Sequence, residues 1–388
     1  MFSLLLALIY VSFISLGLPD SLLGSAWPQM QESLGVSLSL GGVISFLITA
    51  STILSSLMSH QVIQRFGTGA VTMCSVALTA LALFGFSLSN SFFALCLWAI
   101  PYGLGAGSVD AALNNFVALH CKAKHMSWLH CFWGIGATGG PYIMGLCLSR
   151  RGMGWQAGYR TISFLQMALT LILLLSLPLW KKQELPLSGG ETVRPQTPQW
   201  GKLLKRPGVK AALTAFFFYS ALELTTGLWG SSYMVAVRGI SAETAAKWIS
   251  LFYLGITAGR FFSGFLTLRF SDDAMVRLGE ITAIVGILLI LLPLHNLFLC
   301  LGLILTGLGC APIYPSLLHA TPQRFGKSLS QSLMGTQMAI SYLGSTTMPP
   351  VSGFLSEKIS MGLYPVLLLV FALMLTILTE KGRHCSAE

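Results

Sequence analysis

Long runs of apolar residues, separated by short polar segments, form the main pattern of this chain. A helix that crosses the hydrocarbon core of a bilayer needs about 20 mostly apolar residues. Twelve runs of roughly this length can be marked. They cover approximately residues 3–30, 37–59, 70–89, 92–119, 127–149, 158–180, 209–236, 246–268, 276–293, 296–319, 328–351 and 360–379. The pattern predicts an all-α integral membrane protein with twelve transmembrane helices.

The second six runs repeat features of the first six. QRFGTGA begins at residue 64 and LRFSDDA at 268, and GLGAG begins at 103 and GLGCA at 307, so both pairs are 204 residues apart. An even number of spans in each repeat gives the two halves the same orientation, related by a pseudo-twofold axis along the membrane normal. We therefore expect an N-terminal six-helix bundle over 1–180 and a C-terminal one over 209–388. The polar stretch 181–208 between them is predicted to be a flexible cytoplasmic linker.

Composition excludes a soluble protein and a nucleic-acid-binding protein. Hydrophobic residues make up 54% of the chain and charged residues 9%, against about 25% charged residues in soluble domains. The net charge of +10 lies in short loops, where basic residues orient helices and contact anionic lipids. Of the 23 Lys and Arg residues, 16 fall on the side of the two termini and 6 on the other. This asymmetry predicts a multi-pass protein of the cell (inner) membrane with both termini in the cytoplasm, embedded in the lipid bilayer.

Three acidic residues lie near the midpoints of predicted spans, where ionisable groups are costly and usually functional. They are Asp20, Asp110 and Glu223. Asp20 and Glu223 are near-equivalent in the repeat, and Tyr314 is equivalent to Asp110, so all four could face one central cavity. Burial favours the neutral form of a carboxyl group, as proton exchange near neutral pH requires. We predict that the three acids couple proton movement, although each could instead pair locally with an arginine, a backbone N–H or a hydroxyl.

Amide and aromatic side chains in the same layer are candidates for binding a small molecule. Asn114 lies one helical turn after the fourth-span acid, and Asn115 lies at the edge of that face, where a helix-packing role is the alternative. Trp133 and Trp229 could cover the apolar face of a sugar ring, whose hydroxyls need polar partners. His130 could bind substrate or form a hydrogen bond of a gate, and a proton relay is the alternative. Together with Tyr314 and the three acids, these residues form the predicted substrate site.

Three arginines are predicted to act in gating rather than in binding. Arg260 lies more than two turns inside the eighth span, and a lone buried arginine needs an acid or several carbonyl groups as partners. Arg65 and Arg269 lie in equivalent loops of the two halves and are expected to cap helix ends. No Walker loop, His/Cys metal cluster or catalytic triad occurs. We therefore predict that the protein is not an enzyme and binds no metal.

Several motifs resemble the major facilitator superfamily, and more specifically its fucose/glucose–proton symporter family. The loops after the second and eighth spans resemble the superfamily's loop signature, with Gln64-Arg65 in place of Asp-Arg. Four spans carry motifs similar to the symporter family's: Asp20 to Pro28-Gln29, GLGAGSVDAALNNF with Asp110 and Asn114, Gly259-Arg260-Phe261 with Gly264, and Tyr314-Pro315. Glu223 resembles an acid of the glucose-transporting branch. The resemblance implies the major facilitator fold and proton-coupled monosaccharide uptake, with the first- and fourth-span acids serving proton and sugar.

The predicted function is secondary active transport of a sugar-like small molecule by alternating access. A proton gradient would supply the energy without another cofactor, and Na⁺ stays open as the coupling ion. We expect a monomer. Two alternatives remain open at this point: proton-driven efflux of sugars or drugs, and a membrane sensor that transports nothing.

Overall fold

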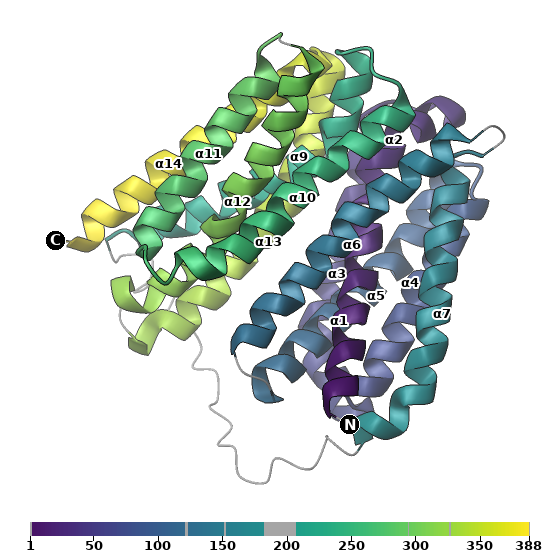
Figure 1. The fold of residues 1–388 in the computed structure, drawn as a ribbon, viewed down its shortest axis with the longest axis horizontal. Helices are drawn as coiled ribbons and strands as arrows, with labels where there is room; N and C mark the ends of the chain where they lie inside the picture. The colour runs from purple at the N-terminus through teal and green to yellow at the C-terminus, as the bar shows by residue number, and fades with distance from the viewer. Residues whose placement is uncertain are drawn as a thin grey trace.

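The chain folds almost entirely into long helices (Figure 1). The computed structural model describes residues 2–120, 123–150, 153–181, 207–293, 295–325 and 327–387. The helices are α1 (Phe2–Asp20), α2 (Leu22–Leu34), α3 (Leu40–Phe66), α4 (Thr68–Leu88), α5 (Phe92–His120), α6 (Ala123–Ser149), α7 (Trp155–Lys181), α9 (Val209–Ala236), α10 (Ala242–Leu266), α11 (Asp272–Leu291), α12 (Asn296–Phe325), α13 (Lys327–Lys358), the 3₁₀ helix η1 (Met361–Leu363) and α14 (Tyr364–Ala387). No strand occurs in the described ranges, so the all-α prediction is confirmed.

The helices form two bundles that lie side by side, α1 to α7 in one and α9 to α14 in the other (Figure 1). We call the side where α1 and α9 begin and α7 and α14 end the terminus face. The side where α2, α9 and α13 end is the opposite face. Most of the predicted linker, residues 182–206, lies outside the described part of the chain.

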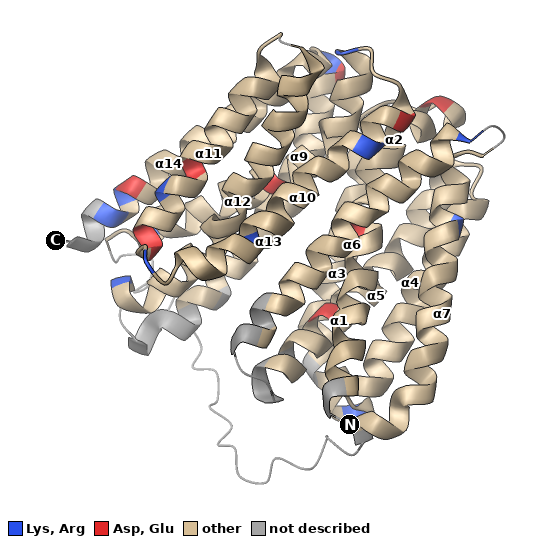
Figure 2. Ribbon diagram, viewed as in Figure 1, with Lys and Arg blue, Asp and Glu red and all other residues tan. Residues whose placement is uncertain are grey.

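Eleven stretches of described helix are long and apolar enough to cross a membrane. The chain is therefore a multi-pass membrane protein. The predicted eleventh span, 328–351, lies within α13, which is long but richer in Ser, Thr, Gly and Pro, and it is not among the eleven. Lys, Arg, Asp and Glu lie mainly at helix ends, with few in the middle of the bundles (Figure 2). Those few are candidates for function, because an ionisable group at membrane depth is costly.

The first predicted span is broken in the middle, which the sequence pattern did not predict. α1 ends at Asp20 and α2 begins at Leu22. Pro19 lacks the N–H that would bond to the carbonyl of Ser15 four residues earlier. Instead, the side chain of Gln166 in α7 donates to that carbonyl at 2.8 Å. The break therefore leaves a satisfied backbone and places Asp20 at a discontinuity.

The internal repeat is visible in how the helices touch. A Cβ on Gly103 of α5 would lie against the carbonyl oxygen of Ile48 in α3, and a Cβ on Gly307 of α12 would lie against that of Phe252 in α10. The two contacts are equivalent in the repeat. Gly307 follows Gly103 by 204 residues, and Phe252 follows Ile48 by the same number. Glycine is needed at these two positions because a side chain would push the backbones apart. Close helix approach at a glycine therefore recurs at equivalent positions of the two halves.

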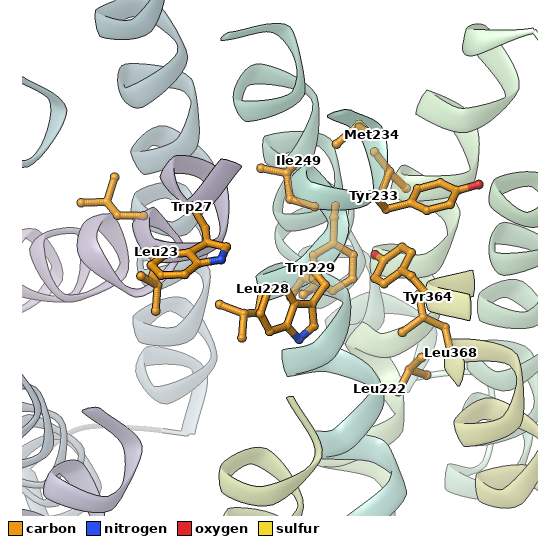
Figure 3. Packing of buried hydrophobic residues seen from close by; sticks show 14 of the residues in the cluster. Leu23, Trp27, Leu222, Leu228, Trp229, Tyr233, Met234, Ile249, Tyr364 and Leu368 are labelled. Carbon is orange, nitrogen blue, oxygen red and sulfur yellow. The ribbon is translucent and has the colours of Figure 1, made fainter. Parts of the chain in front are cut away.

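The two bundles meet tightly near the opposite face. Gly24 of α2 is buried against α9, where a Cβ would strike the Gly227 carbonyl oxygen and come within 2.8 Å of the Leu228 Cα. Figure 3 shows Leu23 and Trp27 of α2 beside Leu228 and Trp229 of α9 at this boundary. The Trp27 ring is 0% exposed, and its indole N–H donates to the Leu38 carbonyl at 2.8 Å.

A polar contact joins the bundles at the surface of the same face. The Ser39 backbone N–H, just before α3, donates to a carboxylate oxygen of Glu357 near the end of α13 at 2.7 Å. Close by, a Cβ on Gly42 would come within 2.7 Å of the Pro350 Cα. A carboxylate at a helix N-terminus accepts from free N–H groups and complements the helix dipole. Glu357 of one bundle therefore caps a helix of the other.

A network of ion pairs holds the C-terminal bundle together at the terminus face. Glu380 of α14 accepts from Arg277 of α11 at 2.7 and 2.9 Å and also from Arg383. Asp273 of α11 contacts Arg324 of α12 and Arg383 of α14. The network thus joins three helices of the C-terminal bundle.

Candidate functional site

The break between α1 and α2 positions the first candidate residue. Asp20 is exposed although it lies at the middle of a membrane span. Its carboxylate accepts from the Tyr102 hydroxyl of α5 at 3.2 Å and from the Trp133 indole N–H of α6 at 2.8 Å. The neighbouring Ser21 hydroxyl donates to the Ala137 carbonyl of α6 at 2.8 Å and holds the break in place. Among the residues that the structure describes, Asp20 is therefore held by neutral donors and forms no ion pair.

Asp110, on α5, is the second acidic residue of the site and lies near Asp20 of α1. The two carboxylates are within electrostatic reach of each other. The Asn114 amide, one turn further along α5, donates to the Asp110 carboxylate at 2.9 Å and to its backbone carbonyl at 3.0 Å. Both side chains are half-buried. The structure thus brings Asp20, Asp110 and Asn114 together, with the amide N–H groups of Asn114 directed to the acid.

Glu223, on the other bundle, is joined to Asp20 through two intervening side chains. Its carboxylate lies 3.7 Å from the Arg260 guanidinium, the pair coming from α9 and α10. The guanidinium carbon lies 5.0 Å from the centre of the Trp133 ring, a distance at which a cation is attracted to an aromatic face. Trp133 in turn donates to Asp20. The contacts therefore run from the N-terminal to the C-terminal bundle, and Arg260 pairs with an acid as expected.

Two further predicted residues lie near the same layer. Tyr314 of α12 is within electrostatic reach of Glu223, Asp110 and Arg260, and is half-buried. Its ring packs against that of Phe216, with centres 5.2 Å apart. His130 of α6 is exposed and lies within reach of Arg260. The structure thus groups both residues with the charged cluster.

One predicted substrate residue is misplaced. Trp229 is 0% exposed, and its indole N–H donates to the Pro349 carbonyl at 2.8 Å. Its ring also fills the space next to Gly353, where a Cβ would touch it. The prediction that Trp229 lines the cavity is wrong, because its ring is buried against Pro349 and Gly353 of α13 inside its own bundle.

The remaining predicted residues contribute less to this cluster. The side chain of Asn115 lies outside the described part of the structure. Arg65 and Arg269 are exposed near the ends of α3 and α10, and neither forms an ion pair with a described residue. The Arg65 guanidinium lies 5.5 Å from the ring of its neighbour Phe66. Their gating role stays a prediction.

Two tyrosines that the sequence analysis missed belong to the cluster. Tyr102 donates to Asp20, and Tyr253 of α10 is within electrostatic reach of both Asp20 and Glu223. A signal existed for Tyr102, which lies about two turns before Asp110 in the same helix. For Tyr253 the sequence offered none, because its partners lie on other helices. Among the described residues, no group of three or more His, Cys, Asp or Glu side chains could hold a metal ion.

Comparison with known proteins shows which family this is. The model of the Major Facilitator Superfamily matches residues 9–247 and 224–381. The chain belongs to this superfamily of membrane transporters, and it has the superfamily's fold of twelve helices in two bundles.

Individual proteins resemble the chain at low identity. It is 21% identical to the bypass of stop codon protein 6 of Saccharomyces cerevisiae, over 95% of this chain and 80% of the relative. It is 22% identical to the glucose/mannose transporter GlcP of Bacillus subtilis, over 79% of this chain and 77% of the relative. The crystal structure of the nucleoside transporter NupG superposes with a TM-score of 0.74 at 17% identity, covering 97% of this chain and 98% of the other. The last match shows the fold alone.

Proposed function

We propose that this chain is a secondary active transporter that takes up a monosaccharide together with protons by alternating access. The observation that carries the proposal is the line of contacts from Asp20 through Trp133 and Arg260 to Glu223. These residues come from both bundles at mid-membrane, which is where transporters of this type bind substrate. Similarity to a glucose/mannose transporter supports a sugar as the substrate.

In the proposed mechanism the N-terminal bundle handles the proton. Asp20 and Asp110 exchange protons with the solvent, and Glu223 provides a third acid on the C-terminal bundle. Ligand hydroxyls contact Asp110 and Asn114, while Trp133 offers an apolar ring. The proton gradient supplies the energy without a further cofactor. We assign the terminus face to the cytoplasm of the cell (inner) membrane, so the contacts between the bundles at Gly24 and at Glu357 lie on the side away from the cytoplasm.

Two rival functions are separated by direct measurement. Proton-driven efflux uses the same acids, but a gradient directed into the vesicle would not drive accumulation. A sensor without transport would move no solute in either direction. Uptake by purified protein in proteoliposomes, driven by a pH gradient or by a Na⁺ gradient, decides among these functions and identifies the coupling ion. Uptake of a monosaccharide driven by the pH gradient alone would support the proposal.

A binding measurement tests the proposed sugar site. A thermal-shift screen of monosaccharides finds the ligand, since one bound only by the folded state raises the apparent stability. Asn114→Ala is then expected to weaken binding up to about tenfold, because one hydrogen bond contributes about 0.5–1.5 kcal/mol. Asn90→Ala, at an exposed position between α4 and α5, is the control and should leave affinity unchanged. Equal affinity of Asn114→Ala and the wild type would place the ligand elsewhere.

Alternating access also predicts a pH effect at the opposite face. Hydrogen bonds from the hydroxyl and backbone N–H of Ser39 lower the pKa of Glu357 below its ordinary value. The contact therefore stabilises the closed face above that pKa and weakens as acid protonates Glu357. An exposed interaction of this kind is worth about 0.5–1 kcal/mol. Acidification should thus raise the population open at this face about twofold to fivefold.

The distance between spin labels on α3 and α13 at the opposite face measures this population. Glu357→Gln is expected to remove the part of the pH dependence that appears below pH 4.5, the ordinary pKa of a glutamate, because the pKa of Glu357 is lowered from that value. Glu32→Gln, at an exposed position on the same face, should keep it. Identical pH dependence in Glu357→Gln and the wild type would show that the cap does not control opening.

A further inference from the structure

The Arg260 guanidinium is held in the middle of the protein with few partners. Glu223 is its ion-pair partner, but the nitrogen and oxygen are 3.7 Å apart, longer than a hydrogen bond. No hydrogen bond to Arg260 occurs among the described residues. A guanidinium carries five N–H donors, and a buried charge normally satisfies them. The site therefore has unused hydrogen-bonding capacity in a place where leaving it unused is costly.

The geometry indicates where this capacity is directed. Trp133 covers one face of the guanidinium at 5.0 Å, and this contact uses the face and leaves the N–H groups at the edge free. The side chains of Arg260 and Glu223 are 22% and 14% exposed. A donor group and an acceptor group thus lie side by side, both partly exposed and not joined by a hydrogen bond.

We propose that Arg260 and Glu223 form a hydroxyl-binding subsite on the C-terminal bundle that recognises a vicinal diol. The guanidinium donates hydrogen bonds to the two oxygens of the diol, and the Glu223 carboxylate accepts a hydrogen bond from one of the hydroxyls. This inference deepens the proposed function and rests on it for the class of ligand, a polyhydroxylated one. It gives Arg260 a binding role in place of the gating role expected from the sequence.

Charge favours a neutral ligand over an acidic one at this subsite. A ligand carboxylate at Arg260 would lie next to Glu223 and, across Trp133, near Asp20. Like charges at such distances repel strongly in a partly buried site. A hydroxyl can satisfy both groups at once, because it donates as well as accepts. The two side chains therefore match a diol better than an anion.

The test compares ligands that differ by one hydroxyl. Calorimetry on the purified full chain gives the Kd of glucose, of its monodeoxy analogues, of glucuronate, of inositol and of a ribonucleoside. The wild type should bind glucose at least about tenfold more tightly than one of the monodeoxy analogues, because a site built around a hydroxyl rejects a ligand that lacks it. Arg260→Gln should weaken glucose binding by a similar factor, so that glucose and that analogue bind equally.

Control variants keep the result interpretable. Arg160→Gln changes an exposed arginine of α7, to which no gating or binding role is assigned, and should leave every Kd unchanged. Arg260→Lys retains the charge but lacks the planar fork, so it should also lose the discrimination. If Arg260→Gln does not fold, Glu223→Gln removes the acceptor with little change in shape and is expected to abolish the same preference.

Each outcome decides between the two proposals. Glucose discrimination that persists in Arg260→Gln and Glu223→Gln overturns the subsite but leaves sugar transport standing. The wild type could bind inositol or the nucleoside but no monosaccharide, and Arg260→Gln could lose this binding. That result would overturn a monosaccharide as the substrate and support the diol subsite. Binding of glucuronate alone, lost in Arg260→Gln, shows a carboxylate subsite and overturns the diol. A wild type that binds none of these compounds overturns both.

Discussion

Asp20→Asn is expected to abolish accumulation of substrate driven by a pH gradient while preserving exchange of substrate across the membrane. Asparagine keeps an oxygen that can accept from Tyr102 or Trp133, which are neutral donors at 3.2 and 2.8 Å in the wild type. It cannot release or take up a proton, so net movement against a gradient loses its energy source. Counterflow needs no net proton movement and should continue. Radiolabelled uptake and counterflow in proteoliposomes measure the two activities separately.

The matched control is Asp272→Asn. Asp272 begins α11 at the terminus face, where it bonds to the exposed His319 at 2.7 Å. The same chemical change there should leave accumulation near the wild-type level. Accumulation by Asp20→Asn equal to that of the wild type would remove Asp20 from proton coupling, and loss of counterflow as well would give it a binding role instead.

Gly24→Leu is expected to lower the uptake rate about tenfold or more. A Cβ at this position would strike the Gly227 carbonyl and approach the Leu228 Cα to 2.8 Å, so the bundles could not close at the opposite face. Overpacking of this kind costs about 1–3 kcal/mol, which corresponds to a population change of about fivefold to a hundredfold. Each bundle should still fold, because the clash lies between them. Spin labels on α2 and α9 should report a larger separation at that face.

Gly264→Leu adds the same side chain where it meets nothing. No atom lies within 4 Å of a Cβ at Gly264, and transport by this variant should match that of the wild type. Normal uptake by Gly24→Leu would mean that the bundles need not approach each other at Gly24 during the transport cycle.

The membrane fold could be predicted from the sequence because length and hydropathy determine it almost directly. The repeat of 204 residues also predicted that Gly103 and Gly307 are equivalent, and the residues that they contact, Ile48 and Phe252, are separated by the same 204 residues. The break at Asp20 was not predicted, because a proline in an apolar run can bend a helix or interrupt it. What decides is whether a neighbour satisfies the freed carbonyl, and here that neighbour is Gln166, 151 residues away.

The site could be predicted only in part, for a similar reason. Depth in a span identified Asp20, Asp110, Glu223 and Arg260, since a charge at that depth is rare. It could not assign the direction of an aromatic ring. The sequence does not distinguish Trp133 from Trp229, since both lie deep in predicted spans. In the structure, Trp133 contacts Arg260 of the other bundle, whereas Trp229 is fully buried. Helix rotation in the bundle decides this, and contacts between distant helices set that rotation.

The ion-pair network of the C-terminal bundle has a consequence for how that bundle is assembled during synthesis. Asp273 and Glu280 enter the membrane with α11, but Arg383 and Thr379, which bond to them, arrive later on α14. Until then the nascent bundle carries acidic groups without these partners. In the N-terminal bundle, Trp180 packs against Gly69 and Phe116 instead, an apolar closure. The later half therefore lacks ionic and polar contacts to α11 until α14 is inserted, whereas α7 closes the earlier half at this place with an apolar ring.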